Sequence, residues 1–113
     1  MHGKKMTIQY VERDREIILK VENHVGGAQT VLLCRRLESL AGSTRRRIIV
    51  DLSGVSSIDS YGLGGLVFSQ RMLEKQGKSL VIVAAEGHVK KAFSQCNLDR
   101  VLTIVDTLDQ ATL

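Results

Sequence analysis

Two short, continuous apolar runs constrain the fold of this chain more than any other feature. Residues 47–52 read RIIVDL, and residues 80–84 read LVIVA. Strands that are apolar at successive positions are buried on both faces, as in parallel sheets covered by helices. A segment with helical periodicity follows each run, so the pattern predicts parallel strands joined by right-handed helical crossovers.

The segments before these runs predict a hairpin followed by a helix. Residues 7–11 alternate between apolar and polar side chains, residues 12–15 form a polar turn, and residues 16–21 read as a second strand. From Ala28 the apolar residues follow helical spacing, which ends near Gly42. The simplest arrangement is an antiparallel hairpin that leads into a helix.

Later segments complete the prediction. We expect a helix from Asp59–Ser60 to Gly77, a helix over 89–96, a strand over 101–105 and a short helix over 107–110. Asn97 suits a left-handed helix end, and Thr107 with Gln110 has the spacing of a capping box. The chain thus predicts a single α/β domain over residues 1–113. Its mixed sheet of four to five strands begins with an antiparallel hairpin, continues with parallel strands, and carries three to four helices.

Composition narrows the class of protein. No apolar run reaches the length of a membrane span, and residues 1–5 lack the apolar core of a signal peptide, so we expect a cytoplasmic protein. Cys34 and Cys96 have no metal or redox spacing and fall within apolar helical patterns, which predicts buried, reduced thiols.

The formal charge of +4 raises the question of nucleic-acid binding. Aromatic residues make up only 4% of the chain, and the basic residues are interleaved with acids. Because a nucleic-acid surface gathers its charge on one element with stacking groups nearby, we expect no nucleic-acid partner.

Residues 51–65, DLSGVSSIDSYGLGG, lie where a parallel strand ends and a helix begins. Ligand and partner sites gather at this edge of such sheets. Asp59 or Ser60 suits the N-cap of the helix. Three glycines follow in the first turns, namely Gly62, Gly64 and Gly65. Since each costs up to about 1 kcal/mol in a helix relative to alanine, they indicate close approach by another macromolecule or tight helix–sheet packing.

The same helix is apolar on two sides. One side, expected to face the sheet, holds Leu63, Leu66, Val67 and Leu73. The opposite side holds Tyr61, Gly65, Phe68 and Met72. A helix of this kind either lies between core elements or carries a docking surface, and both interpretations stay open.

Catalytic patterns are weak. His2, His24 and His88 are scattered, and Ser60 has an acid beside it but no histidine at an informative position. No metal-ligand spacing or general-acid pair stands out. We therefore expect no enzyme activity, no cofactor and no metal.

The stretches Asp51–Val55, Ile58–Ser60 and Gly62–Gly64 together resemble the signature of the STAS domain family, the bacterial anti-sigma factor antagonists. The resemblance extends over nearly the whole chain, because the expected strands and helices come in the family order. It implies a protein-interaction module, and nothing in the sequence demands more than a monomer.

The resemblance also implies a mechanism. Ser60 would be phosphorylated by a serine kinase that is itself the anti-sigma factor, and a metal-dependent serine phosphatase would reset it. The unmodified protein would bind the kinase and free the sigma factor. Ser53, Ser56 and Ser57 are the local rivals for the phosphate. The expected partner-binding residues are His24, Asp59, Ser60, Tyr61, Gly62, Gly64, Gly65, Phe68 and Met72.

Two other functions stay open. The chain could be a constitutive STAS module of a transport or signalling complex, with no serine chemistry. Alternatively, the helix start could bind a small anion or a nucleotide, since helix N-termini attract anions.

Overall fold

The computed structural model describes residues 5–112, so the expectations for residues 1–4, His2 included, lie outside the described residues. The elements in chain order are β1 (Thr7–Glu12), β2 (Glu16–Val25), α1 (Gln29–Ser39), β3 (Arg47–Ile58), α2 (Ser60–Lys75), β4 (Ser79–Val83), α3 (His88–Gln95), β5 (Thr103–Val105) and α4 (Leu108–Ala111). Short 3-10 turns follow α1 at Leu40–Gly42 and α3 at Leu98–Arg100.

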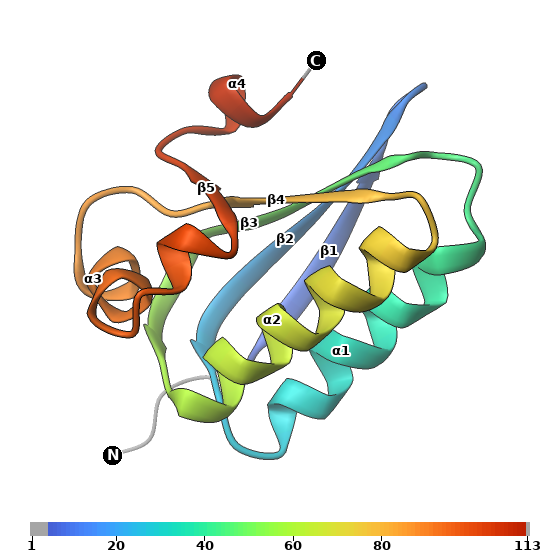
Figure 1. The fold of residues 1–113 in the computed structure, drawn as a ribbon. Helices are drawn as coiled ribbons and strands as arrows, with labels where there is room; N and C mark the ends of the chain where they lie inside the picture. The colour runs from blue at the N-terminus through green and yellow to red at the C-terminus, as the bar shows by residue number, and fades with distance from the viewer. Residues whose placement is uncertain (1–4, 113) are drawn as a thin grey trace.

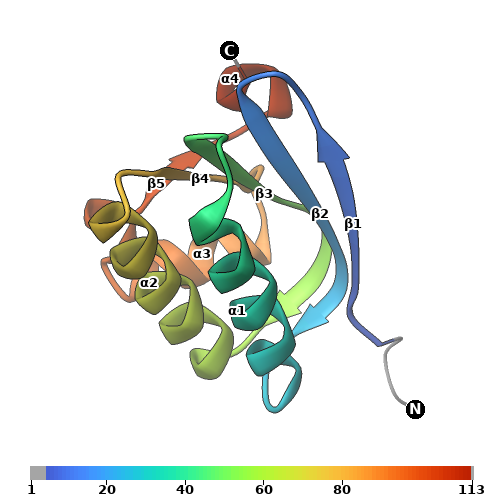
Figure 2. The same ribbon diagram turned by 90° about the vertical axis from the view of Figure 1, so that its right-hand side faces the viewer.

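The strands form one five-stranded sheet in the order β1-β2-β3-β4-β5. β1 pairs with β2 in antiparallel fashion, and the other neighbours are parallel. Helices α1, α2 and α3 lie on one side of the sheet, and α4 lies on the other (Figures 1 and 2). The predicted α/β class, mixed sheet and N-terminal hairpin are confirmed. Within the described residues, no helix is both long and apolar enough to cross a membrane.

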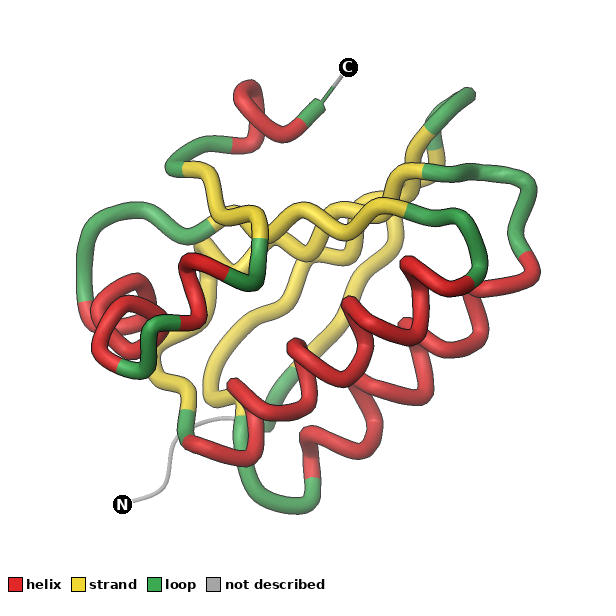
Figure 3. The backbone as a smooth tube through the Cα atoms, viewed as in Figure 1, coloured by secondary structure: helices red, strands yellow, loops and turns green. Residues whose placement is uncertain are grey.

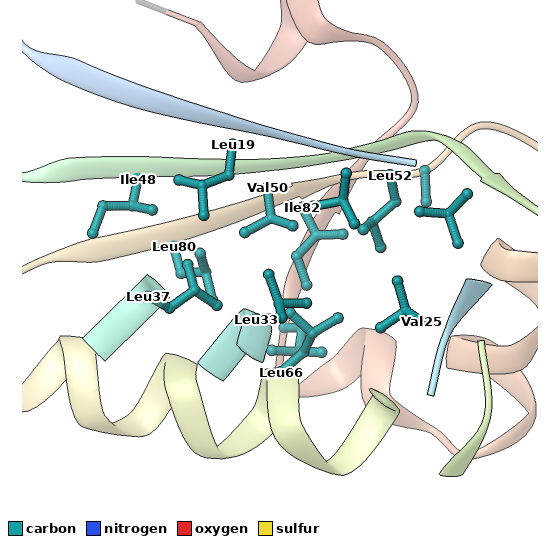
Figure 4. Close-up of a cluster of buried hydrophobic side chains, with 14 of the residues drawn as sticks. Leu19, Val25, Leu33, Leu37, Ile48, Val50, Leu52, Leu66, Leu80 and Ile82 are labelled. Carbon is teal, nitrogen blue, oxygen red and sulfur yellow. The ribbon is translucent and has the colours of Figure 1, made fainter. Parts of the chain in front are cut away.

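The main core lies between the sheet and the layer of α1 and α2 (Figure 4). Ile48 and Val50 of β3 belong to it, together with Leu33 and Leu66 of the helices. Ile49, between these two β3 residues, belongs to a smaller cluster that includes residues of α4. Because both faces of β3 are covered here, this strand is apolar at successive positions.

The two longest strands continue further than the sequence pattern predicts. We expected strands ending at residues 21 and 52, but β2 reaches Val25 and β3 reaches Ile58. The extra segments pair with each other, with register shifts between Lys20 and Glu22 and between Asn23 and His24. They run past the other strands to the starts of α1 and α2 (Figure 3). The expected end of this strand at residue 52 is therefore wrong, because pairing with β2 holds the polar residues 53–58 in the same strand.

The predicted burial of both thiols is also wrong. Cys34 is half-buried and Cys96 is exposed, and both are free. Helix α3 ends one residue earlier than expected, so Cys96 takes the C-cap position outside its buried stripe. Asn97 follows in the left-handed region with φ of 58°, as its residue type predicts.

Candidate functional site

The start of α2 is held by the carboxylate of Asp59. This residue is the N-cap: its Oδ1 accepts a hydrogen bond from the Gly62 amide at 3.0 Å. Its Oδ2 accepts from the Gly27 amide at 3.0 Å, in the turn before α1. Of the two residues that could cap the helix, Asp59 therefore does so, and it also ties the beginnings of α1 and α2 together.

His24, at the extended end of β2, lies beside this carboxylate. Its Nε2 is 3.8 Å from Oδ2 of Asp59, and its Nδ1 is 2.7 Å from Oγ of Ser57 on β3. No sequence pattern pointed to the pairing with Ser57, since the two residues are 33 positions apart. The register shift between Asn23 and His24 places them opposite each other, and such shifts cannot be read from one sequence.

Serine, histidine and aspartate in one cluster raise the possibility of an activated nucleophile. In a hydrolytic triad the acid hydrogen-bonds the imidazole and fixes its tautomer. Here the separation of 3.8 Å between His24 and Asp59 is longer than a hydrogen bond. Both carboxylate oxygens of Asp59 already accept from backbone amides. This geometry ties β2, β3 and α2 together and does not activate Ser57. Among residues 5–112, no group of three acidic, histidine or cysteine side chains could hold a metal ion.

Ser60 is the first residue of α2 and is exposed. Within the described part of the chain, its hydroxyl makes no hydrogen bond. Two of its rivals are engaged, because Ser57 pairs with His24 and Oγ of Ser53 donates to Asp51 at 2.6 Å. Ser56 is exposed as well, but it lies within β3 and not at a helix start. Ser60 therefore presents a free hydroxyl at an accessible helix N-terminus.

The three glycines of the first turns differ in their surroundings. A Cβ on Gly62 would lie 2.7 Å from the Val25 carbonyl oxygen, and one on Gly65 would lie 2.5 Å from Cγ2 of Thr30. Gly64 has no neighbouring atom within 4 Å of such a Cβ. Tight packing inside the domain therefore explains Gly62 and Gly65, and Gly64 alone leaves open space for another molecule.

The residues on the second apolar side of α2 also differ in their exposure to solvent. Tyr61 is 71% exposed and Phe68 is 61% exposed. Gly65 and Met72 are half-buried, and Met72 packs against the main core. Each of the two open interpretations thus applies to part of this side: Gly65 and Met72 lie between elements, whereas Tyr61 and Phe68 face solvent.

Helix α1 adds apolar surface that the sequence pattern did not single out. Val31 is 51% exposed and Leu32 is 53% exposed. Both lie off the buried stripe of Leu33 and Leu37, which was the available sign of their exposure. Since α1 packs beside α2, the exposed apolar side chains near the start of both helices occupy the same helical layer (Figure 2).

Comparisons with known proteins agree with this architecture. A protein of Thermotoga maritima named as a candidate anti-sigma factor antagonist is 35% identical over 65 residues, which are 58% of this chain and 58% of that relative. The crystal structure of an anti-sigma factor antagonist from Mycobacterium paratuberculosis superposes with a TM-score of 0.86 at 20% identity, covering 95% of this chain and 91% of the other. A Thermotoga maritima crystal structure with a similar name gives a TM-score of 0.82 at 27% identity, covering 92% and 90%. The model of the STAS domain matches residues 7–111, and the chain therefore belongs to the STAS domain family.

Proposed function

We propose that this protein is an anti-sigma factor antagonist that is switched by phosphorylation of Ser60. In this proposal the unphosphorylated form binds an anti-sigma factor and so releases a sigma factor. The observation that carries the proposal is the free, exposed hydroxyl of Ser60 at the capped start of α2. The names of the relatives support the same function.

The domain itself can accommodate the phosphate. A phosphoserine adds about −1.5 to −2 charges at pH 7, and the N-terminal end of a helix favours negative charge. The neighbouring carboxylate of Asp59 is engaged by the amides of Gly27 and Gly62, so it stays in place beside the new group. We therefore expect phosphorylation to leave the fold intact.

The partner, in contrast, would have to desolvate the phosphate. A dianion buried at an interface without a cation costs several kcal/mol, and each 1.4 kcal/mol lowers affinity about tenfold. The switch then works by local repulsion and needs no large rearrangement of the domain.

The proposed contact surface surrounds Ser60. Tyr61 and Phe68 supply exposed apolar side chains, and Gly64 leaves room for close approach. The remaining proposed contacts are His24, Asp59, Gly62, Gly65 and Met72, which support this surface from positions that are half-buried or buried. The proposed partners are an anti-sigma factor that is also a serine kinase, and a metal-dependent serine phosphatase that resets the switch.

Phosphorylation and binding can be tested together. We expect incubation with the cognate anti-sigma kinase and ATP to add one phosphate at Ser60, detected by mass spectrometry of peptides. Ser60→Ala should prevent this and keep binding, whereas Ser60→Asp should weaken binding at least about tenfold with an unchanged circular dichroism spectrum. Ser56→Ala is the matched control and should behave as the parent. Phosphate at another serine, or full binding by Ser60→Asp, would contradict the proposal.

A constitutive interaction module is the second candidate, and the exposure of Tyr61 and Phe68 favours it, because an apolar surface binds without serine chemistry. In that case Phe68→Ser would abolish binding while Ser60→Asp would leave it unchanged. The two variants measured side by side by calorimetry separate the candidates.

A further inference from the structure

We propose that the end of the sheet opposite Ser60 holds a binding site for a small phosphate-bearing molecule. A cavity of about 430 Å³ opens there, and it is lined by Asp14, Arg15, Thr44, Arg46, Arg47 and Ser79. These residues come from the turn between β1 and β2, from the segment that leads into β3, and from the first residues of β3 and β4. The pairing of Arg47 with Ser79 brings the starts of β3 and β4 together at the cavity.

One cation of the cavity is already fixed in position. The guanidinium of Arg47 donates to the carbonyl oxygen of Ala111 through Nε at 2.8 Å and through Nη2 at 2.6 Å. This residue is half-buried at the first position of β3. Its remaining N–H groups keep their capacity to donate, and a guanidinium held in one orientation loses little freedom when it binds an oxyanion.

Two further cations are available. Arg15 and Arg46 are exposed, and their guanidinium groups make no hydrogen bond or ion pair with any residue from 5 to 112. Asp14 is the acid of the lining, so three arginines face one carboxylate. Thr44 and Ser79 add hydroxyl donors. Several guanidinium groups and hydroxyl groups around one cavity can donate hydrogen bonds to the oxygens of a phosphate group.

The surrounding charges increase the positive potential. Lys78 is only 7% exposed, and its ammonium donates to the carbonyl oxygens of Ser43 and Arg45 beneath the turn that carries Thr44 and Arg46. Two neighbouring arginines are paired with acids, Arg13 with Glu16 and Arg45 with Glu12.

The cavity indicates a small ligand and not a nucleic acid strand. Its volume lies in the range of small-molecule sites, roughly 300–1,000 Å³. No aromatic side chain is among the lining residues, so bases would find no stacking surface.

Titration with inorganic pyrophosphate tests the proposal on the whole protein. In nitrogen-15 correlated NMR spectra, we expect saturable shifts of the backbone amides of Arg15, Thr44, Arg46 and Ser79 at millimolar ligand. The amides of Ser60 and Tyr61 should stay in place. The absence of saturable shifts at the cavity, or equal shifts at both ends, would overturn the proposal.

A charge-matched pair of variants shows whether the site or the overall charge is responsible. Arg15→Ala with Arg46→Ala should weaken binding at least about tenfold, since charge-assisted hydrogen bonds to phosphate are lost. Arg71→Ala with Lys91→Ala removes two exposed cations from α2 and α3 and should leave binding within about twofold. Equal loss in both pairs would overturn the proposal.

Phosphate groups also occur on lipids. A second experiment therefore distinguishes a small soluble ligand from a lipid headgroup. Sedimentation with vesicles of phosphatidylcholine mixed with phosphatidylglycerol should leave the protein in the supernatant. Retention on vesicles together with no response to pyrophosphate would assign this end to a membrane surface and overturn the proposal of a small soluble ligand.

Discussion

At the scale of single residues, Asp59 has the most connected position at the candidate site. Its two carboxylate oxygens accept hydrogen bonds from an amide in the first turn of α2 and from an amide in the turn before α1. His24 lies beside this carboxylate. The sequence already predicted a cap at residues 59–60, because capping depends on local chemistry. The second contact, to Gly27, is 32 residues away and required the fold.

Removing this carboxylate should destabilise the domain. Because an N-cap contributes about 1 kcal/mol and a second hydrogen bond up to a similar amount, we expect Asp59→Ala to lower the free energy of unfolding by about 1–2 kcal/mol. Asp59→Asn keeps an oxygen acceptor and should lose about half as much. Urea unfolding followed by circular dichroism measures both.

Asp14→Ala provides the control for this experiment, since Asp14 is exposed in the turn between β1 and β2. Substitutions of exposed residues of this kind change the free energy of unfolding by no more than about 0.5 kcal/mol. If Asp59→Ala lost no more stability than Asp14→Ala, the capping carboxylate would not hold the start of α2.

At the scale of elements, the contact between α1 and α2 determines which glycines the helix needs. A Cβ on Gly65 would lie 2.5 Å from Cγ2 of Thr30 and 2.9 Å from Sγ of Cys34. The sequence showed three costly glycines in one helix and could not show which of them faces α1. That distinction depends on how closely two helices approach each other, and no local pattern reports it.

The two neighbouring glycines should respond to alanine in opposite directions. Gly64→Ala faces open space and should raise the free energy of unfolding by about 0.5–1 kcal/mol, because alanine is the better helix former. Gly65→Ala should lower it by about 1–3 kcal/mol through overpacking against α1. Thermal and urea unfolding of the two variants give the comparison.

A second change tests the cause. Thr30→Ser removes the methyl group nearest to position 65 and keeps the hydroxyl. In the Gly65→Ala background it should recover part of the lost stability, which gives a favourable coupling in a double-mutant cycle. Additive losses in that cycle would mean that crowding against Thr30 is not the cause.

The strands show where sequence reasoning succeeds and where it ends. The apolar runs of β3 and β4 predicted buried parallel strands, because burial on both faces leaves a pattern in the residues themselves. The polar halves of β2 and β3 leave no such pattern and are strands because they pair with each other. Gly54 fits this pairing, since a Cβ there would lie 2.9 Å from Cγ of Glu22.

At the scale of the whole molecule, the two proposed sites lie at opposite ends of β3. Arg47 begins this strand at the basic cavity, and Ile58 ends it just before the cap of α2. Roughly 35 Å of strand separates these ends, which is several times the Debye length of about 8 Å at physiological ionic strength. The exposed serine could be predicted from one local motif. The cavity could not, because its residues come from separate turns.

The two ends should therefore act independently. We expect Ser60→Asp to bind pyrophosphate with the affinity of the parent protein, within about twofold, because charges at this distance are screened. In the same way, Arg15→Ala with Arg46→Ala should leave phosphorylation of Ser60 by the kinase unchanged. Calorimetry and a kinase assay measure these two effects, and a change beyond threefold in either would reveal coupling through the sheet.

The bond between the Arg47 guanidinium and the Ala111 carbonyl spans 64 residues. During synthesis, β2 and β3 leave the ribosome well before α4, so Ile18 and Ile49 emerge without the helix that packs against their cluster. Exposed strand surface promotes association between unfinished chains. A chain truncated before residue 108 would keep the residues of its helix-covered core but would lack the cover on the other side of the sheet.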